Sequence, residues 1–155
     1  MIRSEFVNEG PAGRAERGSA ALFVVFFAVA VLALAGLLVD VGNAINAKER
    51  AADLAEQAAR AAANSIDVAS LRAGTVSIDR NTACVNAQAL IQTYASTSGV
   101  RAAMTGPCTY PTPRQVTVYV SVTTTPMISA FFGDFTMHAH ETACAEFGIL
   151  QGVGC

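Results

Sequence analysis

The chain has 155 residues, of which 52% are hydrophobic and only 14% are charged, and its formal net charge is −2. A net charge this close to zero provides no basic field that would recruit nucleic acid. The charged fraction is low for a freely soluble protein, so we expect the chain to lie against a membrane or against other subunits.

The longest apolar run covers residues 19–39, which carry no charge and no proline. As a helix that rises about 1.5 Å per residue, this run would span about 30 Å, the thickness of the hydrocarbon core of a bilayer. We predict a leader at residues 1–18 and a single transmembrane anchor at residues 19–39. Two alternatives stay open: a secretory signal cleaved after Ala35, and processing between Gly18 and Ser19, which would keep the anchor.

The helix is expected to continue past the membrane as an amphipathic segment over residues 40–66, because alanine, the best helix former, is abundant there. Small apolar residues recur at three-, four- and seven-residue steps, which places them on one helix face. This helix-packing stripe comprises Ala44, Ala51, Ala55, Ala58 and Ala62. It packs either on the chain's own domain or on a neighbouring helix. Asp40 and Gly42 mark the membrane boundary. Asp40 is expected to face the headgroup water, with pairing to a basic partner as the alternative, and Gly42 is expected to bend the helix.

Residues 67–155 are predicted to form a small α+β head. A helix is expected over residues 84–98, ended by Gly99, after a stretch in which residues 75–78 alternate like a short strand. The clearest strand is residues 115–124, within which valine alternates with polar residues without exception over residues 116–123.

A second strand over residues 135–143 should pair antiparallel with residues 115–124, and the amphipathic helix should cover their apolar face. The expected fold class is therefore α+β: a transmembrane helix that continues into a long amphipathic helix, with a small antiparallel sheet in a pilin-like head.

All four cysteines follow the anchor: Cys84, Cys108, Cys144 and Cys155. An even number without C-x-x-C spacing fits two disulfides in an oxidising compartment, which places the head outside the cytoplasm. The three leader arginines agree with a cytoplasmic N-terminus. Of the three possible pairings we favour Cys84–Cys108 with Cys144–Cys155, because each closes a local loop. Free thiols remain an alternative, whereas a zinc site would lack closely spaced cysteine pairs.

Three residues are the only candidates for catalysis or metal binding. His138 and His140 lie two apart on a strand, so both side chains point to one face, but Glu141 points to the other and no third ligand is near. Phosphate-binding loops, a serine nucleophile elbow and the H-E-x-x-H motif are absent from the sequence. We therefore predict no enzyme activity, no cofactor, no bound metal and no small-molecule substrate; a metal-dependent envelope enzyme using the two histidines is the least favoured hypothesis.

The order of these segments resembles a known family. Arg17-Gly18, an anchor that ends in Leu38-Val39-Asp40-Val41-Gly42, and residues 50–63, RAADLAEQAARAAA, are similar to the TadE/TadG-like proteins of Flp (tight-adherence) pilus-assembly systems of the actinobacterial type. The valine strand, Phe131-Phe132-Gly133 and the terminal strand extend this similarity across most of the chain. The resemblance implies a single-pass, pilin-like protein whose head faces outward.

The resemblance also implies a role and partners. Such proteins assist assembly of the pilus or of an associated secretion apparatus, or they enter the fibre as minor pilins or pseudopilins. The implied partners are the lipid bilayer, other pilin-like subunits and Tad-type assembly platform proteins. Processed pilins of this system carry glutamate at the fifth position after the glycine, where this chain has Phe23, which favours the unprocessed, TadG-like form. The alternative function is a surface-tethered module for adhesion or partner binding without a fibre role.

Overall fold

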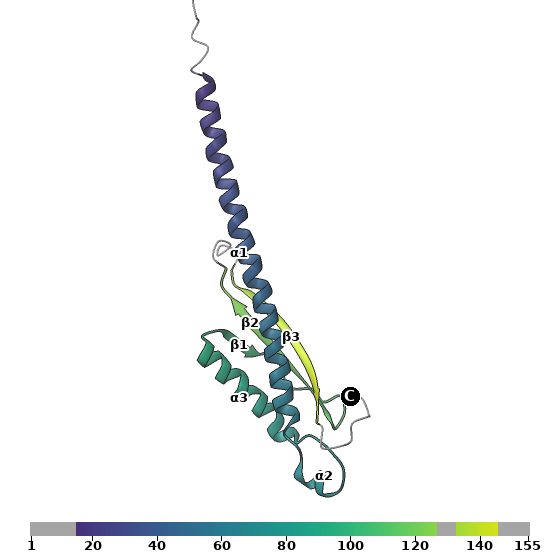
Figure 1. Ribbon diagram of the computed structural model, residues 1–155. Coiled ribbons are helices and arrows are strands. Elements are labelled where there is room, and N and C mark those ends of the chain that lie inside the picture. Colours follow the sequence, from purple (N-terminus) through teal and green to yellow (C-terminus); the bar gives the residue numbers. More distant parts are fainter. Residues whose placement is uncertain (1–14, 127–132, 146–155) are drawn as a thin grey trace, which may run out of the picture.

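The computed structural model describes residues 15–126 and 133–145. Its elements, in chain order, are α1 (Ala15–Ala63), α2 (Val68–Arg72), α3 (Arg80–Ser98), β1 (Arg101–Met104), β2 (Gln115–Thr124) and β3 (Phe135–Cys144). The C-terminal half of α1 packs against a three-stranded antiparallel sheet of order β1-β2-β3, and its N-terminal half projects beyond the head (Figure 1). This is the α+β, pilin-like layout that the sequence predicts.

The first element, α1, is one unbroken helix of 49 residues. Between Leu22 and Ile45 every large apolar side chain is exposed, and Leu38 reaches 74%. Within the described residues, α1 is the single helix that is long and apolar enough to cross a membrane, judged by length and composition. The projecting half of α1 is therefore a candidate membrane anchor.

The sheet is built around β2, which pairs with β1 on one side and with β3 along its whole length on the other. Its four alternating valines are buried and face α1. Their partners on β3 are mostly apolar as well, for example Ala139 opposite Val120 and Met137 opposite Val122. The predicted strands, their antiparallel pairing and the covering helix are all confirmed, because a period of two leaves only one face of β2 fit for a core.

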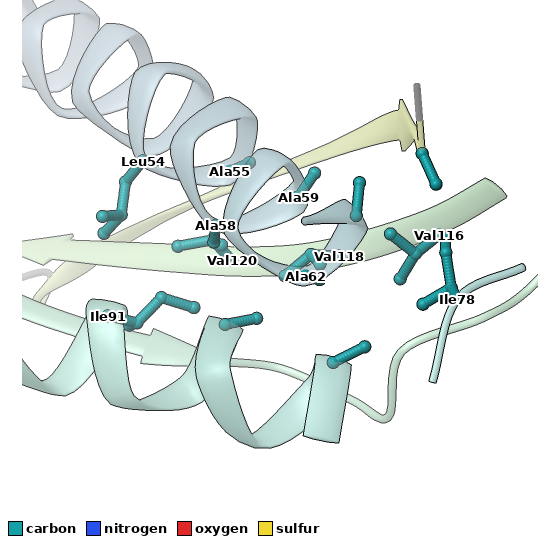
Figure 2. Close-up of a cluster of buried hydrophobic side chains, with 14 residues drawn as sticks. Leu54, Ala55, Ala58, Ala59, Ala62, Ile78, Ile91, Val116, Val118 and Val120 are labelled. Carbon is teal, nitrogen blue, oxygen red and sulfur yellow. The ribbon is translucent and has the colours of Figure 1, made fainter. Parts of the chain in front are cut away.

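The core lies between α1, α3 and the inner face of the sheet (Figure 2). The largest side chains with almost no exposure are Leu54, Ile91, Val116, Val118, Val120 and Val122. Alanines from α1 and α3 fill the remaining space, so the helices lie close to the valines of β2. Each fully buried valine or leucine contributes about 1.5–3 kcal/mol relative to an exposed one, so this small core supplies most of the stability of the head.

Three local features differ from the sequence expectations. The sheet has three strands, because the short strand β1 pairs with the far edge of β2. Residues 75–78 form no strand; Ile78 makes only a single bridge to Ile66, and α2 precedes them. Helix α3 begins at Arg80, four residues before the expected start, and ends as expected at Ser98, followed by Gly99 in the left-handed conformation.

The early start of α3 is explained by its N-cap. The Asp79 carboxylate accepts a hydrogen bond of 2.9 Å from the amide of Asn81 and one of 3.0 Å from the hydroxyl of Thr82. The bond from Asn81 satisfies a backbone N–H that the first turn leaves without a helical partner, and the bond from Thr82 holds the Asp79 carboxylate in place. We expect Asp79→Ala to lower the free energy of unfolding by about 1 kcal/mol, measured by denaturant titration.

Asp53→Ala is the matched control for the Asp79 variant, because Asp53 is an exposed aspartate in the middle of α1 and caps no helix. An equal loss of stability in the two variants would contradict the capping role of Asp79.

Candidate functional site

The helix-packing stripe on α1 is used inside the molecule. Ala51, Ala55, Ala58 and Ala62 each have 0% exposure and lie against the chain's own sheet and α3, while Ala44 is only half-buried. Of the two alternatives that the sequence leaves open, the structure shows packing on the chain's own head. The stripe lies opposite the valines of β2, where the small alanine side chains let the helix approach the sheet closely.

The prediction that Asp40 faces the headgroup water is wrong, since its side chain is only 3% exposed. Asp40 lies two helical turns before Ala47, a core residue, and is therefore on the face of α1 that turns toward the head. A buried carboxylate needs a polar contact, and Asp40 makes one. Gly42 lies nearby inside the helix, which passes through it unbroken.

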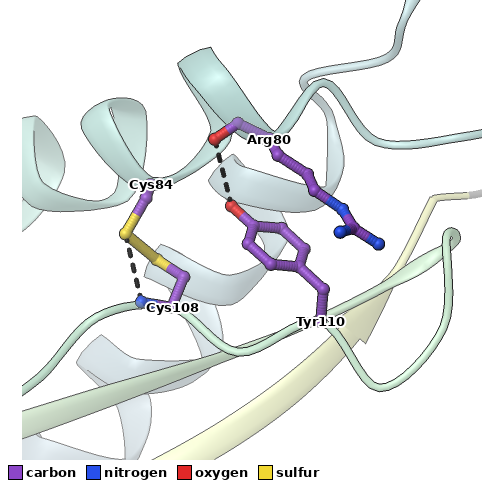
Figure 3. Close-up of a disulfide and its surroundings, with 4 residues drawn as sticks. All are labelled: Arg80, Cys84, Cys108 and Tyr110. Carbon is purple, nitrogen blue, oxygen red and sulfur yellow. Dashed lines mark hydrogen bonds between the residues drawn. A yellow bond between two sulfur atoms is a disulfide. The ribbon is translucent and has the colours of Figure 1, made fainter.

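A covalent clamp holds the loop after β1 to the start of α3 (Figure 3). Cys84 and Cys108 form the disulfide that the sequence analysis favoured, with Cα atoms 5.7 Å apart, and the amide of Cys108 donates to Cys84 Sγ at 3.3 Å. The other favoured pairing includes Cys155, which lies outside the described residues, so Cys144–Cys155 stays a prediction.

Tyr110 supports the same clamp. Its hydroxyl donates to the Arg80 carbonyl at 3.4 Å, and the Arg80 guanidinium lies over its ring, 5.2 Å from the centroid. Burial raises the pKa of the Tyr110 phenol above its usual range, the positive charge of Arg80 opposes this shift, and Asp79 adds to it. The phenol therefore stays neutral and keeps donating its hydrogen bond at physiological pH.

The two histidines lie on the outer face of the sheet, away from α1. His138 and His140 are both exposed, and the ring of His140 stacks on Tyr119 with centroids 5.5 Å apart. Glu141 faces the other side, opposite Val118. Across the described residues, no three side chains of histidine, cysteine, aspartate or glutamate come together in a way that could hold a metal ion.

A cleft that the sequence analysis missed lies beside α1 at the end of the head nearest the projecting half. It measures about 280 Å³. It is lined by Asn43, Asn46, Ala47, Arg50, Gly99, Val100, Arg101 and the residues from Val122 to Thr125. In the sequence, the cleft could be anticipated only from the spacing of Asn43, Asn46 and Arg50, because these residues share a face of the predicted helix.

Residues 18–65 match the family model of Flp pilus-assembly TadE/G-like proteins, called Tad. Over this segment the chain is similar to the TadE/G-like proteins. The match begins at the candidate processing site, Gly18 and Ser19, which lies inside α1, and it ends just after α1. No curated protein and no solved structure matches the chain.

The TadE/G-like segment therefore coincides with α1, both its exposed apolar half and its buried alanine stripe. The match does not include the valine strand or the terminal strand, to which the sequence analysis extended the resemblance. To this similarity the geometry adds a candidate membrane anchor that continues directly into the core of the head.

Proposed function

We propose that this chain is a membrane-anchored, pilin-like component that assists assembly of a Flp/Tad-type pilus or an associated secretion apparatus. It acts through helix packing and protein contacts, not through catalysis. The observation that carries the proposal is the division of α1 into an exposed apolar half and a half buried in the head, in a segment that is TadE/G-like.

The exposed half of α1 favours insertion into lipid. Exposure of so many large apolar side chains to water is unfavourable by roughly 25 cal/mol per Å². Within a bilayer the same side chains are solvated by acyl chains, and the backbone hydrogen bonds of the helix are satisfied internally. The proposed anchor, residues 19–39, spans about 30 Å at about 1.5 Å per residue, which is long enough for the hydrocarbon core.

The proposed orientation has the N-terminus in the cytoplasm and the head on the outer side. The Cys84–Cys108 disulfide supports this, since structural disulfides persist in oxidising compartments. We propose a leader at residues 1–18, an anchor at residues 19–39, and a head in which the helical segment 40–66 folds together with residues 67–155.

The partners proposed are other pilin-like subunits and Tad-type platform proteins. Since the alanine stripe is already buried in the chain's own core, the surfaces left for these partners are the projecting half of α1 and the outside of the head. Helix packing between subunits would therefore take place within the bilayer, where close-packed apolar helices associate through van der Waals contact.

The function is tested by placing a charge in the anchor. Val29→Arg puts a cation near the middle of the apolar run, at a cost of about 2.5–3.5 kcal/mol for insertion. We expect less protein in the membrane fraction and a matching loss of surface fibres or secretion in a strain that carries only this variant. Val29→Ala, at the same exposed position, is the control and should behave as the original chain.

Normal fibre assembly by a Val29→Arg protein that has left the membrane would contradict the proposal. Mass and N-terminal sequence of the protein recovered from its membrane add a second readout. A start at Met1 favours a permanently anchored assembly factor, a start at Ser19 favours a processed fibre subunit, and a start at Gly36 would mean that no anchor is retained.

A further inference from the structure

We propose that the cleft beside α1 binds the phosphate group of an anionic phospholipid at the membrane surface on the side of the head. This headgroup cleft is defined by the lining residues given above, from Asn43 to Arg50 on α1 and from Gly99 to Arg101 and Val122 to Thr125 on the head. The inference rests on the proposed membrane anchor and adds a specific lipid ligand to it.

The wall formed by α1 presents polar side chains in a fixed pattern. Asn43, Asn46 and Arg50 follow one another at steps of three and four residues and so lie on one helix face. Two amides and one guanidinium supply several N–H donors, while phosphate oxygens are pure acceptors. A volume of about 280 Å³ accommodates a phosphate and part of its glycerol.

Two arginines give the cleft its charge. Arg50 is exposed and forms no ion pair within the described part of the chain. Arg101 is bound through one nitrogen, Nη2, which lies 2.8 Å from Asp134 and donates to Thr125 at 2.6 Å. Its Nε and Nη1 groups take no part in these two bonds and provide further donors. Asp134 offsets part of the charge of Arg101, so the remaining positive charge of the cleft favours a bound anion of low charge, such as a phosphodiester.

The height of the cleft matches the headgroup layer. Exposed apolar residues on the projecting half of α1 end at Ile45, between Asn43 and Asn46. Counted from Val39, where the proposed anchor ends, Asn43 lies about 6 Å and Arg50 about 16 Å farther along the axis, at about 1.5 Å per residue. Side chains on a helix tilt toward its N-terminus, which here is the membrane side. The headgroup layer is about 5–7 Å deep on each side of the hydrocarbon core, so Asn43 lies at its level and the long side chain of Arg50 extends toward it from the side of the head.

The chemistry of arginine favours specific binding of a lipid phosphate over nonspecific electrostatic attraction to the membrane surface. The planar guanidinium donates two parallel hydrogen bonds to a phosphate, which adds geometry to charge. A lysine or arginine near an anionic membrane surface contributes on the order of 1 kcal/mol, equivalent to about a fivefold change in binding.

The test uses native mass spectrometry of the full chain in detergent, supplied with equal amounts of phosphatidylglycerol and phosphatidylcholine. We expect the protein to retain phosphatidylglycerol in preference to phosphatidylcholine. Arg50→Gln should reduce this preference about fivefold. Arg60→Gln is the matched control, because Arg60 is also an exposed arginine of α1 but pairs with Glu56 far from the cleft. Circular dichroism of each variant verifies that the helices are retained.

Three outcomes would overturn the assignment: equal retention of the two lipids, a folded Arg50→Gln protein with unchanged preference, or an equal loss in Arg60→Gln. A further arm adds inorganic phosphate without phosphatidylglycerol. Saturable binding of phosphate alone, lost in Arg50→Gln, would replace the lipid by a soluble phosphate ligand.

Flotation with vesicles separates this inference from the proposed function. A protein that floats with neither phosphatidylcholine nor phosphatidylglycerol vesicles would contradict the membrane anchor itself. A protein that floats with both but shows no lipid preference by mass spectrometry would contradict the headgroup cleft and leave the anchor intact.

Discussion

Replacement of Ala58 by phenylalanine is expected to destabilise the head strongly. Ala58 has 0% exposure and lies on the face of α1 that packs against β2, near Val120 (Figure 2). A benzyl group at this position would need space that the valines occupy, and the helix would have to move away from the sheet. Overpacking typically costs 1–3 kcal/mol even for added methylenes, so we expect a loss of about 3 kcal/mol or more from a total stability on the order of 5–15 kcal/mol.

Ala52→Phe is the matched control, since Ala52 is on the exposed side of the same helix. The two variants are compared by urea titration of the full chain in detergent, with far-ultraviolet circular dichroism as the signal. Similar midpoints for Ala58→Phe and Ala52→Phe would contradict the buried position of the stripe. A stable Ala52→Phe protein that fails to support fibres would instead identify the exposed side of α1 as a surface for subunit contact.

Removal of the Cys84–Cys108 disulfide is expected to have an effect of similar size. The bond closes a loop with a sequence separation of 24 residues. Without it, the unfolded chain gains conformational entropy worth about 3.5 kcal/mol for a loop of this length. We expect the Cys84→Ser/Cys108→Ser double variant to unfold at a clearly lower denaturant concentration than the original chain under oxidising conditions.

A reducing agent supplies the control for the disulfide. Addition of dithiothreitol to the original chain should lower its midpoint at least to that of the double serine variant. A further decrease when dithiothreitol is added to the double variant would belong to Cys144 and Cys155. If the double variant were as stable as the original chain, the clamp around Tyr110 would be held by its noncovalent contacts alone.

The strands show how far a sequence pattern predicts structure. In β2, four valines alternate with polar residues from Gln115 to Thr123, so the strand, its buried face and its bounds are all predicted correctly. In β1, only the four residues Arg101–Met104 pair with β2, and two of them are alanines. A strand this short has too little contrast between its faces to be recognised, because its pairing depends on the edge that β2 offers.

The candidate site shows a second limit. A helical pattern places Ala51 and Ala55 on one face, but it does not indicate whether that face meets the same chain or another one. The burial of Asp40 and the cleft beside Arg50 depend on where the end of the sheet lies relative to α1. Arg101 comes close to this part of α1 only because β1 pairs with β2, a contact between distant parts of the chain that periodicity does not encode.

The continuity of α1 has a mechanical consequence. The helix that projects from the head is the same helix whose alanines form the head's core, and no loop interrupts it. A helix resists bending because bending strains its hydrogen bonds. Tilt or rotation of the projecting half is therefore transmitted to the head as a movement of a rigid body. A force along the axis loads the contact between α1 and β2 in shear, across the whole row of alanines and valines at once.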